Sequence, residues 1–181
     1  MKRDHASEPQ PLALDEAAID AARQHTGDGA VTPAYGPWRD NIVELLNAAL
    51  ATEITCVLRY RRHHFTADGV SSPAIAAEFL VHADEELAHA DRLAARIVQL
   101  GGKPDLRPET LPKRSHAAYD ESATLKAQIE SNLVAERVAV ETYRQMIALI
   151  GDKDPTTRRL LEDILAEEER HADELHNWMT R

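Results

Sequence analysis

The residues of this chain best suited to chemistry are glutamates and histidines that occur twice in one arrangement. Each copy is a glutamate followed, 33 or 32 residues later, by a second glutamate with a histidine three positions beyond it. On a helix this last spacing places the carboxylate and the imidazole on one face, where both are ligands for divalent metals. A single Glu-x-x-His pair is weak evidence, whereas its recurrence at matched spacing is specific. The two copies are Glu53, Glu86 and His89, and Glu136, Glu168 and His171.

Other positions also match between the two copies. A tyrosine stands seven residues after each leading glutamate, at Tyr60 and Tyr143, and each histidine begins a His-Ala-Asp tripeptide. The aspartates of these tripeptides, Asp91 and Asp173, fall on a different helix face and are expected to be surface charges. His82 stands one helical turn before the second glutamate of the first copy. It is therefore the candidate for an accessory role at the site.

Each of the four glutamates interrupts an apolar stripe of its predicted helix. Positions on the same face as Glu53, for example, include Leu46 and Val57. Burying an unpaired carboxylate costs on the order of several kcal/mol, so a core with four of them must protonate them, pair them or bind cations. No Lys or Arg occupies the neighbouring stripe positions. The sequence therefore predicts a site for two divalent ions, and the mixed oxygen and nitrogen ligands favour iron, with manganese second, over zinc or copper.

Composition indicates a compact all-α chain without a membrane segment. The 181 residues are 43% hydrophobic, with 4% aromatic residues and seven glycines. No run of 18 apolar residues occurs, and Met1-Lys2-Arg3 is not followed by an apolar signal-peptide core, so we expect a cytoplasmic protein. The net charge of −10 argues against binding to nucleic acid, which requires a basic face. The single cysteine, Cys56, cannot form an internal disulfide and is expected in the core.

Turn and capping residues divide the chain into an N-terminal extension, residues 1–36, and a four-helix domain, residues 37–181. A short helix can form in the extension over Asp15–Gln24. The basic end of the first long helix, including His63 and His64, is expected to face solvent, where it suits the helix dipole. The four long helices are predicted at Trp38–Phe65, from Ser72-Pro73 to Gly101, at Glu121–Ile150 and from Asp154-Pro155 to Trp178.

Connection lengths predict the topology. Short turns join the first helix to the second and the third to the fourth, so each pair forms an antiparallel hairpin. About 18 residues with three prolines, Gly102–Tyr119, separate the hairpins. A 27-residue helix is about 40 Å long, and an extended strap of this length can reach about 60 Å. The strap can therefore cross the whole bundle, so that the two hairpins pack about a pseudo-two-fold axis with the two glutamate and histidine sets facing each other.

This pattern resembles the ferritin-like di-iron carboxylate superfamily, in which two helices each supply a glutamate and two supply Glu-x-x-His within a four-helix bundle with one long crossover. The resemblance covers about residues 38–178 and is closest to bacterioferritins and to Dps-like mini-ferritins with the site inside one subunit. It implies a tyrosine beside the site, at Tyr60. It also implies that two Fe2+/Fe3+ ions are bound in this way: one by Glu53 and His89, the other by Glu136 and His171, with Glu86 and Glu168 bridging them.

Departures from the family refine the expectation. Bacterioferritins bind haem through a methionine after the second-helix glutamate, and this position is Leu87, so no haem is expected. Rubrerythrin-like peroxidases add a glutamate where this chain has Ala139. Ten residues follow His171, too few for the fifth helix that lines the pores of 24-subunit ferritins. A homo-oligomer is expected, and a dodecamer is favoured over a 24-mer.

The resemblance implies a ferroxidase that oxidises Fe(II) with O2 or H2O2 for iron storage, iron detoxification and protection against oxidative stress. Two alternatives stay open. One is an enzyme of the manganese-catalase or peroxidase type on the same bundle, which would turn over peroxide without taking up iron. The other is a Dps-like structural or DNA-associated shell, in which the metal only braces the fold.

Overall fold

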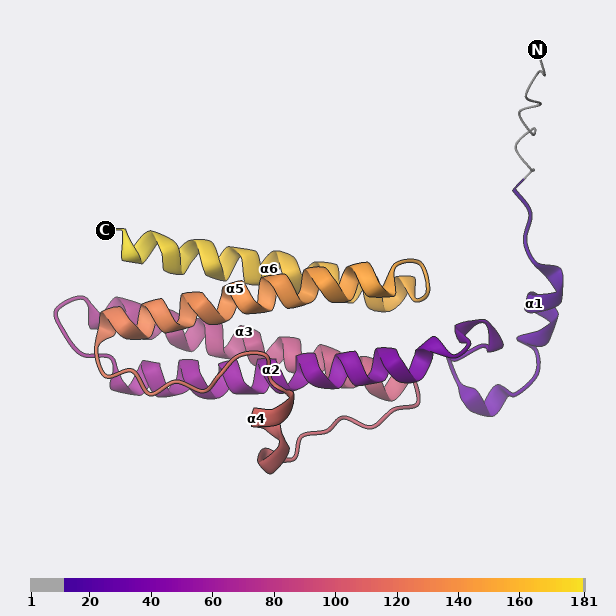
Figure 1. Cartoon of the computed structure of the whole chain (residues 1–181), viewed down its shortest axis with the longest axis horizontal. Coiled ribbons are helices and arrows are strands. Elements are labelled where there is room, and N and C mark those ends of the chain that lie inside the picture. Colours follow the sequence, from indigo (N-terminus) through magenta and orange to yellow (C-terminus); the bar gives the residue numbers. More distant parts are fainter. Residues whose placement is uncertain (1–11, 181) are drawn as a thin grey trace, which may run out of the picture.

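The computed structural model describes residues 12–180 and has four long helices packed side by side as a bundle (Figure 1). The first two helices form one antiparallel hairpin and the last two form another, and the described residues contain no strand. The predicted all-α bundle of two hairpins joined by a long crossover is confirmed. Residues 1–11 of the predicted extension lie outside the described residues. The long helices are α2 (Trp38–Thr66), α3 (Ser72–Gln99), α5 (Leu125–Ile150) and α6 (Pro155–Met179).

The ends of the helices follow from capping residues. Asp154 caps α6 by accepting a hydrogen bond from the Thr157 N–H at 3.0 Å. Helix α5 begins four residues later than predicted, because Thr124 caps it by accepting from the Ala127 N–H at 3.3 Å. The same helix ends as predicted at Gly151, whose φ of +51° suits a residue without a side chain.

The crossover spans the bundle, as predicted, and runs along α2, but it is not a plain extended strap (Figure 1). It contains a 3-10 turn, η3 (Pro108–Thr110), followed by the short helix α4 (Leu111–Arg114). Leu111 is buried, and the Arg114 guanidinium donates to the Asn47 carbonyl oxygen at 2.8 Å. An extended strap would be longer than the bundle requires. The surplus chain therefore forms helical turns that satisfy its own backbone and anchor it to α2.

The crossover also overturns one expectation about the end of α2. His63 was predicted to face solvent, but it is fully buried, and Arg59 one turn earlier is buried as well. Arg59 donates to the Ala118 carbonyl oxygen at 2.9 Å, and Asn132 on α5 lies 2.9 Å from His63 Nδ1. These side chains are covered because the crossover and the start of α5 pack against this turn, which the sequence of α2 does not reveal.

The core of the bundle has two hydrophobic clusters separated by a buried polar layer. The first cluster lies toward the N-terminal end of α2, and the second lies toward its C-terminal end. The six predicted ligands fall between these clusters along every helix. The first cluster includes Leu46, Leu93, Ile97, Met146 and Leu161, and the second includes Cys56, Tyr60, Phe79, Ile129 and Leu175. Cys56 is thus in the core, as predicted.

Among residues 12–180, α2 is long and apolar enough to cross a membrane. However, 56% of its most apolar stretch is buried inside the bundle. It packs along its length against α3 and carries the buried Glu53 at its centre. These contacts identify α2 as a core helix of the bundle.

The described part of the extension lies beyond the end of the bundle (Figure 1). It contains the short helix α1 (Glu16–Ala21), capped by Asp15, and the 3-10 turns η1 (Thr26–Asp28) and η2 (Pro33–Tyr35). Helix α1 buries no residue. The extension joins the bundle through Tyr35, whose hydroxyl accepts a hydrogen bond from Arg96 at 3.2 Å.

Candidate metal centre

The structure brings the six predicted ligand residues together in the middle of the bundle. Each of the four helices contributes at the same level, with one glutamate from α2 and one from α5, and a glutamate with a histidine from α3 and from α6. All six side chains are at most 1% exposed. They are Glu53, Glu86, His89, Glu136, Glu168 and His171.

Every one of these residues carries a buried polar atom without a hydrogen-bond partner. On the histidines this atom is Nδ1, the nitrogen that faces the carboxylates. Buried polar groups are normally paired, and a cluster of orphaned donors and acceptors signals a missing partner. Carboxylate oxygens and imidazole nitrogens are the donor set that divalent iron or manganese accepts. The residues therefore fit a metal site. The orphaned atoms are Glu53 Oε2, Glu86 Oε1, His89 Nδ1, Glu136 Oε2, both carboxylate oxygens of Glu168, and His171 Nδ1.

The ligand atoms form two overlapping groups. In each group the atoms lie within 4.8 Å of one another, close enough for a single ion to contact all of them. His89 Nδ1 is 3.4 Å from Glu53 Oε2 and 3.0 Å from Glu168 Oε1, without the alignment of a hydrogen bond. Glu86 and Glu168 belong to both groups, which is the geometry of two adjacent ions with shared carboxylates. One group is Glu53, Glu86, His89 and Glu168, and the other is Glu86, Glu136, Glu168 and His171.

The repeated tyrosines connect the two repeats. The Tyr60 hydroxyl donates to Glu136 Oε1, and the Tyr143 hydroxyl donates to Glu53 Oε1. Each tyrosine thus holds the leading glutamate of the opposite repeat, and both rings are fully buried. Tyr60 lies beside the site, as the family resemblance implied, and Tyr143 is its counterpart across the pseudo-two-fold axis.

Two glutamates that sequence reasoning missed hold the histidines in place. His171 Nε2 is 2.8 Å from Glu85 Oε2, and His89 Nε2 is 3.0 Å from Glu167 Oε2. Partners of this kind fix the ring orientation of a metal-binding histidine. Each stands directly before the motif glutamate of the other repeat, so both motifs read Glu-Glu-x-x-His, and this doubled glutamate was the available signal. The aspartates of the His-Ala-Asp tripeptides are exposed, as predicted.

A profile of the ferritin-like domain matches residues 43–181, which include all six candidate ligand residues, most of α2 and the whole of α3, α5 and α6. The chain belongs to the ferritin-like family.

Relatives of this ferritin-like protein include a bacterioferritin from Desulfovibrio desulfuricans, 29% identical over 137 residues that cover 75% of this chain and 73% of the relative. Among solved structures, the dodecameric thioferritin of Bacteroides fragilis is 30% identical with a TM-score of 0.76, over 78% of this chain and 86% of that one. A bacterioferritin structure from D. desulfuricans, described with a di-iron site in different catalytic states, is 26% identical with a TM-score of 0.70, over 78% and 80% of the two chains.

His82 joins the centre of this ferritin-like protein from α3. It is fully buried, its Nδ1 lies 3.1 Å from the Tyr60 hydroxyl, and its ring stacks on that of His171 with centroids 4.2 Å apart. Burial, with the nearby His171, lowers the pKa of His82. His82, for which an accessory role was predicted, therefore lies next to the candidate ligands. Its ring is neutral at physiological pH.

In the metal-free cluster, burial and the neighbouring groups decide which carboxyl groups ionise. Burial, together with the charge of Glu53, raises the pKa of Glu168 to about 8. Burial and the charge of Glu168 raise the pKa of Glu86 well above its usual value. Burial acts in the same direction on Glu136, but the nearby His171 ring and the hydrogen bond from Tyr60 hold its pKa at about 2. The metal-free cluster thus retains protons on two carboxyl groups, and bound cations would displace them.

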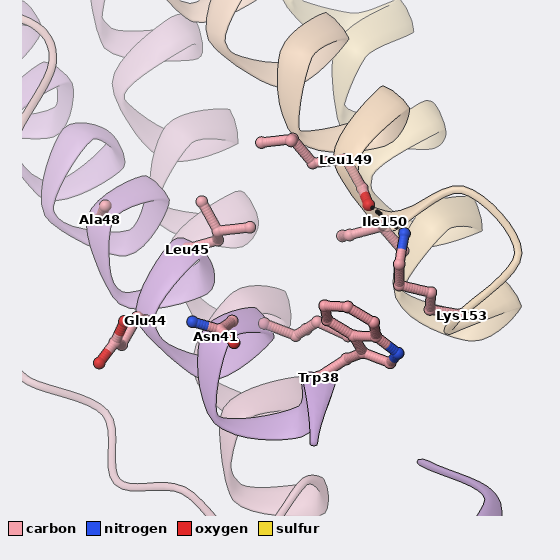
Figure 2. A pocket seen from close by; sticks show the side chains of 9 residues that line it. Trp38, Asn41, Glu44, Leu45, Ala48, Leu149, Ile150 and Lys153 are labelled. Atoms are coloured by element: carbon pink, nitrogen blue, oxygen red, sulfur yellow. Dashed lines mark hydrogen bonds between the residues drawn. The ribbon is translucent and has the colours of Figure 1, made fainter. Parts of the chain in front are cut away.

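A cavity of about 630 Å³ lies away from this centre, at the surface of the bundle (Figure 2). It opens at the surface between the start of α2 and the end of α5, where Trp38, Leu45 and Leu149 face it, and Lys153 Nζ lies 5.3 Å from the Trp38 ring. Glu44 is its single carboxylate. This apolar cavity lacks the ligand set of a metal site and is not part of the centre.

Proposed function

We propose that this ferritin-like protein binds two Fe(II) ions as substrates in the middle of each subunit, oxidises them and stores the iron as Fe(III). The observation that carries this proposal is the pair of overlapping ligand groups, built from buried atoms that have no other partner. Two dications neutralise the four carboxylates. Without these cations, the buried negative charges would destabilise the polar layer between the two hydrophobic clusters.

The proposed roles of the ligands follow the two groups. Glu53 and His89 bind one ion, Glu136 and His171 bind the other, and the shared glutamates, Glu86 and Glu168, bridge them. A carboxylate has two oxygens, so it can shift between bridging the two metal ions and binding only one of them. The site can therefore adapt when each Fe(II) becomes Fe(III) and the local charge rises.

The proposed chemistry is a paired electron transfer. Two Fe(II) ions give up one electron each, and hydrogen peroxide with two protons takes both electrons and yields two water molecules. Dioxygen with two protons accepts the same two electrons and yields hydrogen peroxide. Because both electrons leave together, no radical is released. The hydrophobic clusters on both sides of the polar layer keep bulk water away from this step.

The relatives support the wider role. A bacterioferritin and a dodecameric thioferritin are similar to this chain over about three quarters of its length. We propose a cytoplasmic homo-oligomer, a dodecamer in preference to a 24-mer, whose shell holds the ferric product and which protects against iron and peroxide. Neither haem nor manganese is required by the proposed reaction.

The decisive test is an anaerobic titration of the metal-free protein with Fe(II), followed by the addition of oxidant and by sizing of the product. We expect two ions per chain before oxidation and many more per particle afterwards. Glu86→Gln, which removes a shared ligand, should lose the paired binding and the oxidation. Glu130→Gln is the matched control, because Glu130 is an exposed residue of α5 that makes no hydrogen bond. Parallel runs with O2 and H2O2 identify the oxidant.

The alternatives predict different results in the same experiment. Rapid peroxide turnover by a manganese-loaded protein, without iron uptake, would establish a catalase or peroxidase. Wild-type oxidation in Glu86→Gln, together with salt-sensitive retardation of DNA by the purified protein, would establish a shell in which the metal is structural. Either result would refute iron storage.

A further inference from the structure

A second group of metal-ligating side chains lies between α3 and α6, on the surface side of the centre. Glu78 and His82 are one helical turn apart on α3, and Glu174 faces them from α6. His82 Nε2 is 2.9 Å from Glu174 Oε2 and 3.9 Å from Glu78 Oε1. One atom from each residue lies within 4.8 Å of the others. The imidazole is fully buried, whereas 36% of the Glu78 side chain and 34% of the Glu174 side chain are exposed.

His82 also belongs to the interior of the bundle. Its donor atoms form a further group with Glu136 and His171, two ligands of the proposed di-iron site, again within 4.8 Å. Within residues 12–180, it is the residue shared between a surface group of potential ligands and a group that contains the buried ligands. One ring nitrogen faces the exposed carboxylates and the other faces the centre, beside the Tyr60 hydroxyl.

We propose that Glu78, His82 and Glu174 form a third divalent-cation site, at which Fe(II) binds from solution before it reaches the buried centre. The existence of this site stands on its own geometry, and its part in iron entry rests on the proposed function. One imidazole nitrogen and two carboxylates leave coordination positions open to water, as an ion in transit requires.

The surroundings indicate that binding at this third site is weak. Glu174 also accepts hydrogen bonds from Arg170, at 3.1 Å to Oε1 and 3.2 Å to Oε2, and Arg170 donates to Glu85 at 2.9 Å. An incoming cation must compete with this guanidinium for Glu174. A weak site at the surface beside a strong buried one favours movement of the ion inward, since the four buried carboxylates offer the larger charge.

The test is an anaerobic titration of the full-length protein with Co(II), which reports each bound ion without oxidation. The wild type is expected to bind two ions tightly and a third more weakly. The double variant Glu78→Gln, Glu174→Gln is expected to lose the third ion and to retain the tight pair with unchanged affinity. Glu130→Gln should bind all three. Both replaced side chains are partly exposed, and a far-UV circular dichroism spectrum checks that the variant is folded.

The outcomes separate the third site from the proposed function. If the double variant still binds three ions, or if the wild type binds only two, the third site is refuted while the di-iron proposal stands. If Co(II) binds only at the third site, the di-iron proposal fails alone. In stopped-flow oxidation, the double variant should react more slowly at limiting Fe(II) and reach the wild-type rate at saturating Fe(II). An unchanged rate at limiting Fe(II) would refute the role in entry.

Discussion

Each histidine of the centre has one nitrogen directed at the carboxylates and the other held by a glutamate of the opposite repeat. Glu85 holds His171, and Glu167 holds His89. The tyrosines cross between repeats in the same way, so neither repeat can position its own ligands without the other. At the residue scale, therefore, the site is assembled by contacts between the two hairpins.

Replacing Glu168 by glutamine should stabilise the metal-free protein. The same change should abolish the further stabilisation that bound metal gives. The pKa of Glu168 is about 8 in the folded state and about 4.3 in an unfolded chain. Between these pH values the folded state holds a proton that the unfolded chain releases, so the stability of the wild type falls as the pH rises through this window. Glutamine mimics the protonated side chain and removes that loss. Guanidinium unfolding in EDTA between pH 4 and pH 8 measures the difference, and a shrinking advantage of the variant with rising pH would contradict the prediction.

Replacing Glu167 by glutamine should weaken metal binding without removing a ligand. The amide cannot hold His89 as the carboxylate does, and such outer partners typically contribute about 10- to 100-fold to metal affinity. The tighter part of the Co(II) isotherm should therefore shift by about that factor. Glu169→Gln is the matched control, because Glu169 is exposed and loses the same charge. Equal isotherms for the two variants would show that Glu167 does not position the ring.

At the scale of helices, a buried ion pair joins the helices at the end of the bundle where α5 ends and α6 begins. Arg96 near the end of α3 donates to both carboxylate oxygens of Asp154 at 2.8 Å, and Asp154 also caps α6. Both side chains are at most 5% exposed. Through Tyr35, the same arginine joins the extension to the bundle. This one cluster therefore fixes α3, the start of α6 and the approach to α2 relative to each other.

Asp154→Asn should destabilise the folded protein by about 3–5 kcal/mol at neutral pH, because Arg96 would remain buried without a counter-charge. Burial opposes ionisation of Asp154, but hydrogen bonds from Thr157 and Arg96 outweigh it and lower its pKa. The stabilisation by Asp154 is thus complete above the unfolded pKa of about 3.9 and is lost as the pH falls through the folded value. Denaturant unfolding from pH 7 to pH 2.5 should show the wild type and the variant converging at acid pH. Asp152→Asn, at an exposed position of the same turn, should cost less than about 1 kcal/mol.

At the scale of the whole molecule, the six proposed ligands all lie in the bundle, and residues 12–36 of the extension add no residue to their groups. Helix α1 lies off the end of the bundle and buries no residue (Figure 1). Leu12 and Leu14 are exposed, and the apolar cavity beside Trp38 is open to the surface (Figure 2). The division at residues 36 and 37 stays a prediction, and the metal centre supplies a way to test it.

Deletion of residues 1–31, which keeps Tyr35 and its bond to Arg96, should leave the Co(II) stoichiometry unchanged. The free energy of unfolding should change by less than about 1 kcal/mol, because residues 12–31 bury little surface. Titration and denaturant unfolding of the truncated chain measure both quantities. Loss of tight metal binding would show that the extension is part of the metal-binding domain.

Much of the fold could be predicted because each helix carries its own signals. The positions of Glu53 and Glu136 in their apolar stripes, and the 3.6-residue period that places each histidine beside its glutamate, are properties of single helices. The prolines and glycines between them set the connection lengths, and these lengths limit the topology to two hairpins with a crossover. The six candidate ligands and their convergence follow from these local rules.

The remaining features depend on how the helices are rotated and offset against each other. Glu85 and Glu167 were missed as partners of the histidines, because a residue's position on its own helix does not identify its neighbour on another. His63 is buried by a crossover far away in sequence, and α4 exists because that crossover has surplus length to pack on α2. The sequence by itself determined the helices and the ligand types. Only the tertiary structure decided the pairing across the two repeats, since those contacts arise between helices whose relative orientation no single periodicity encodes.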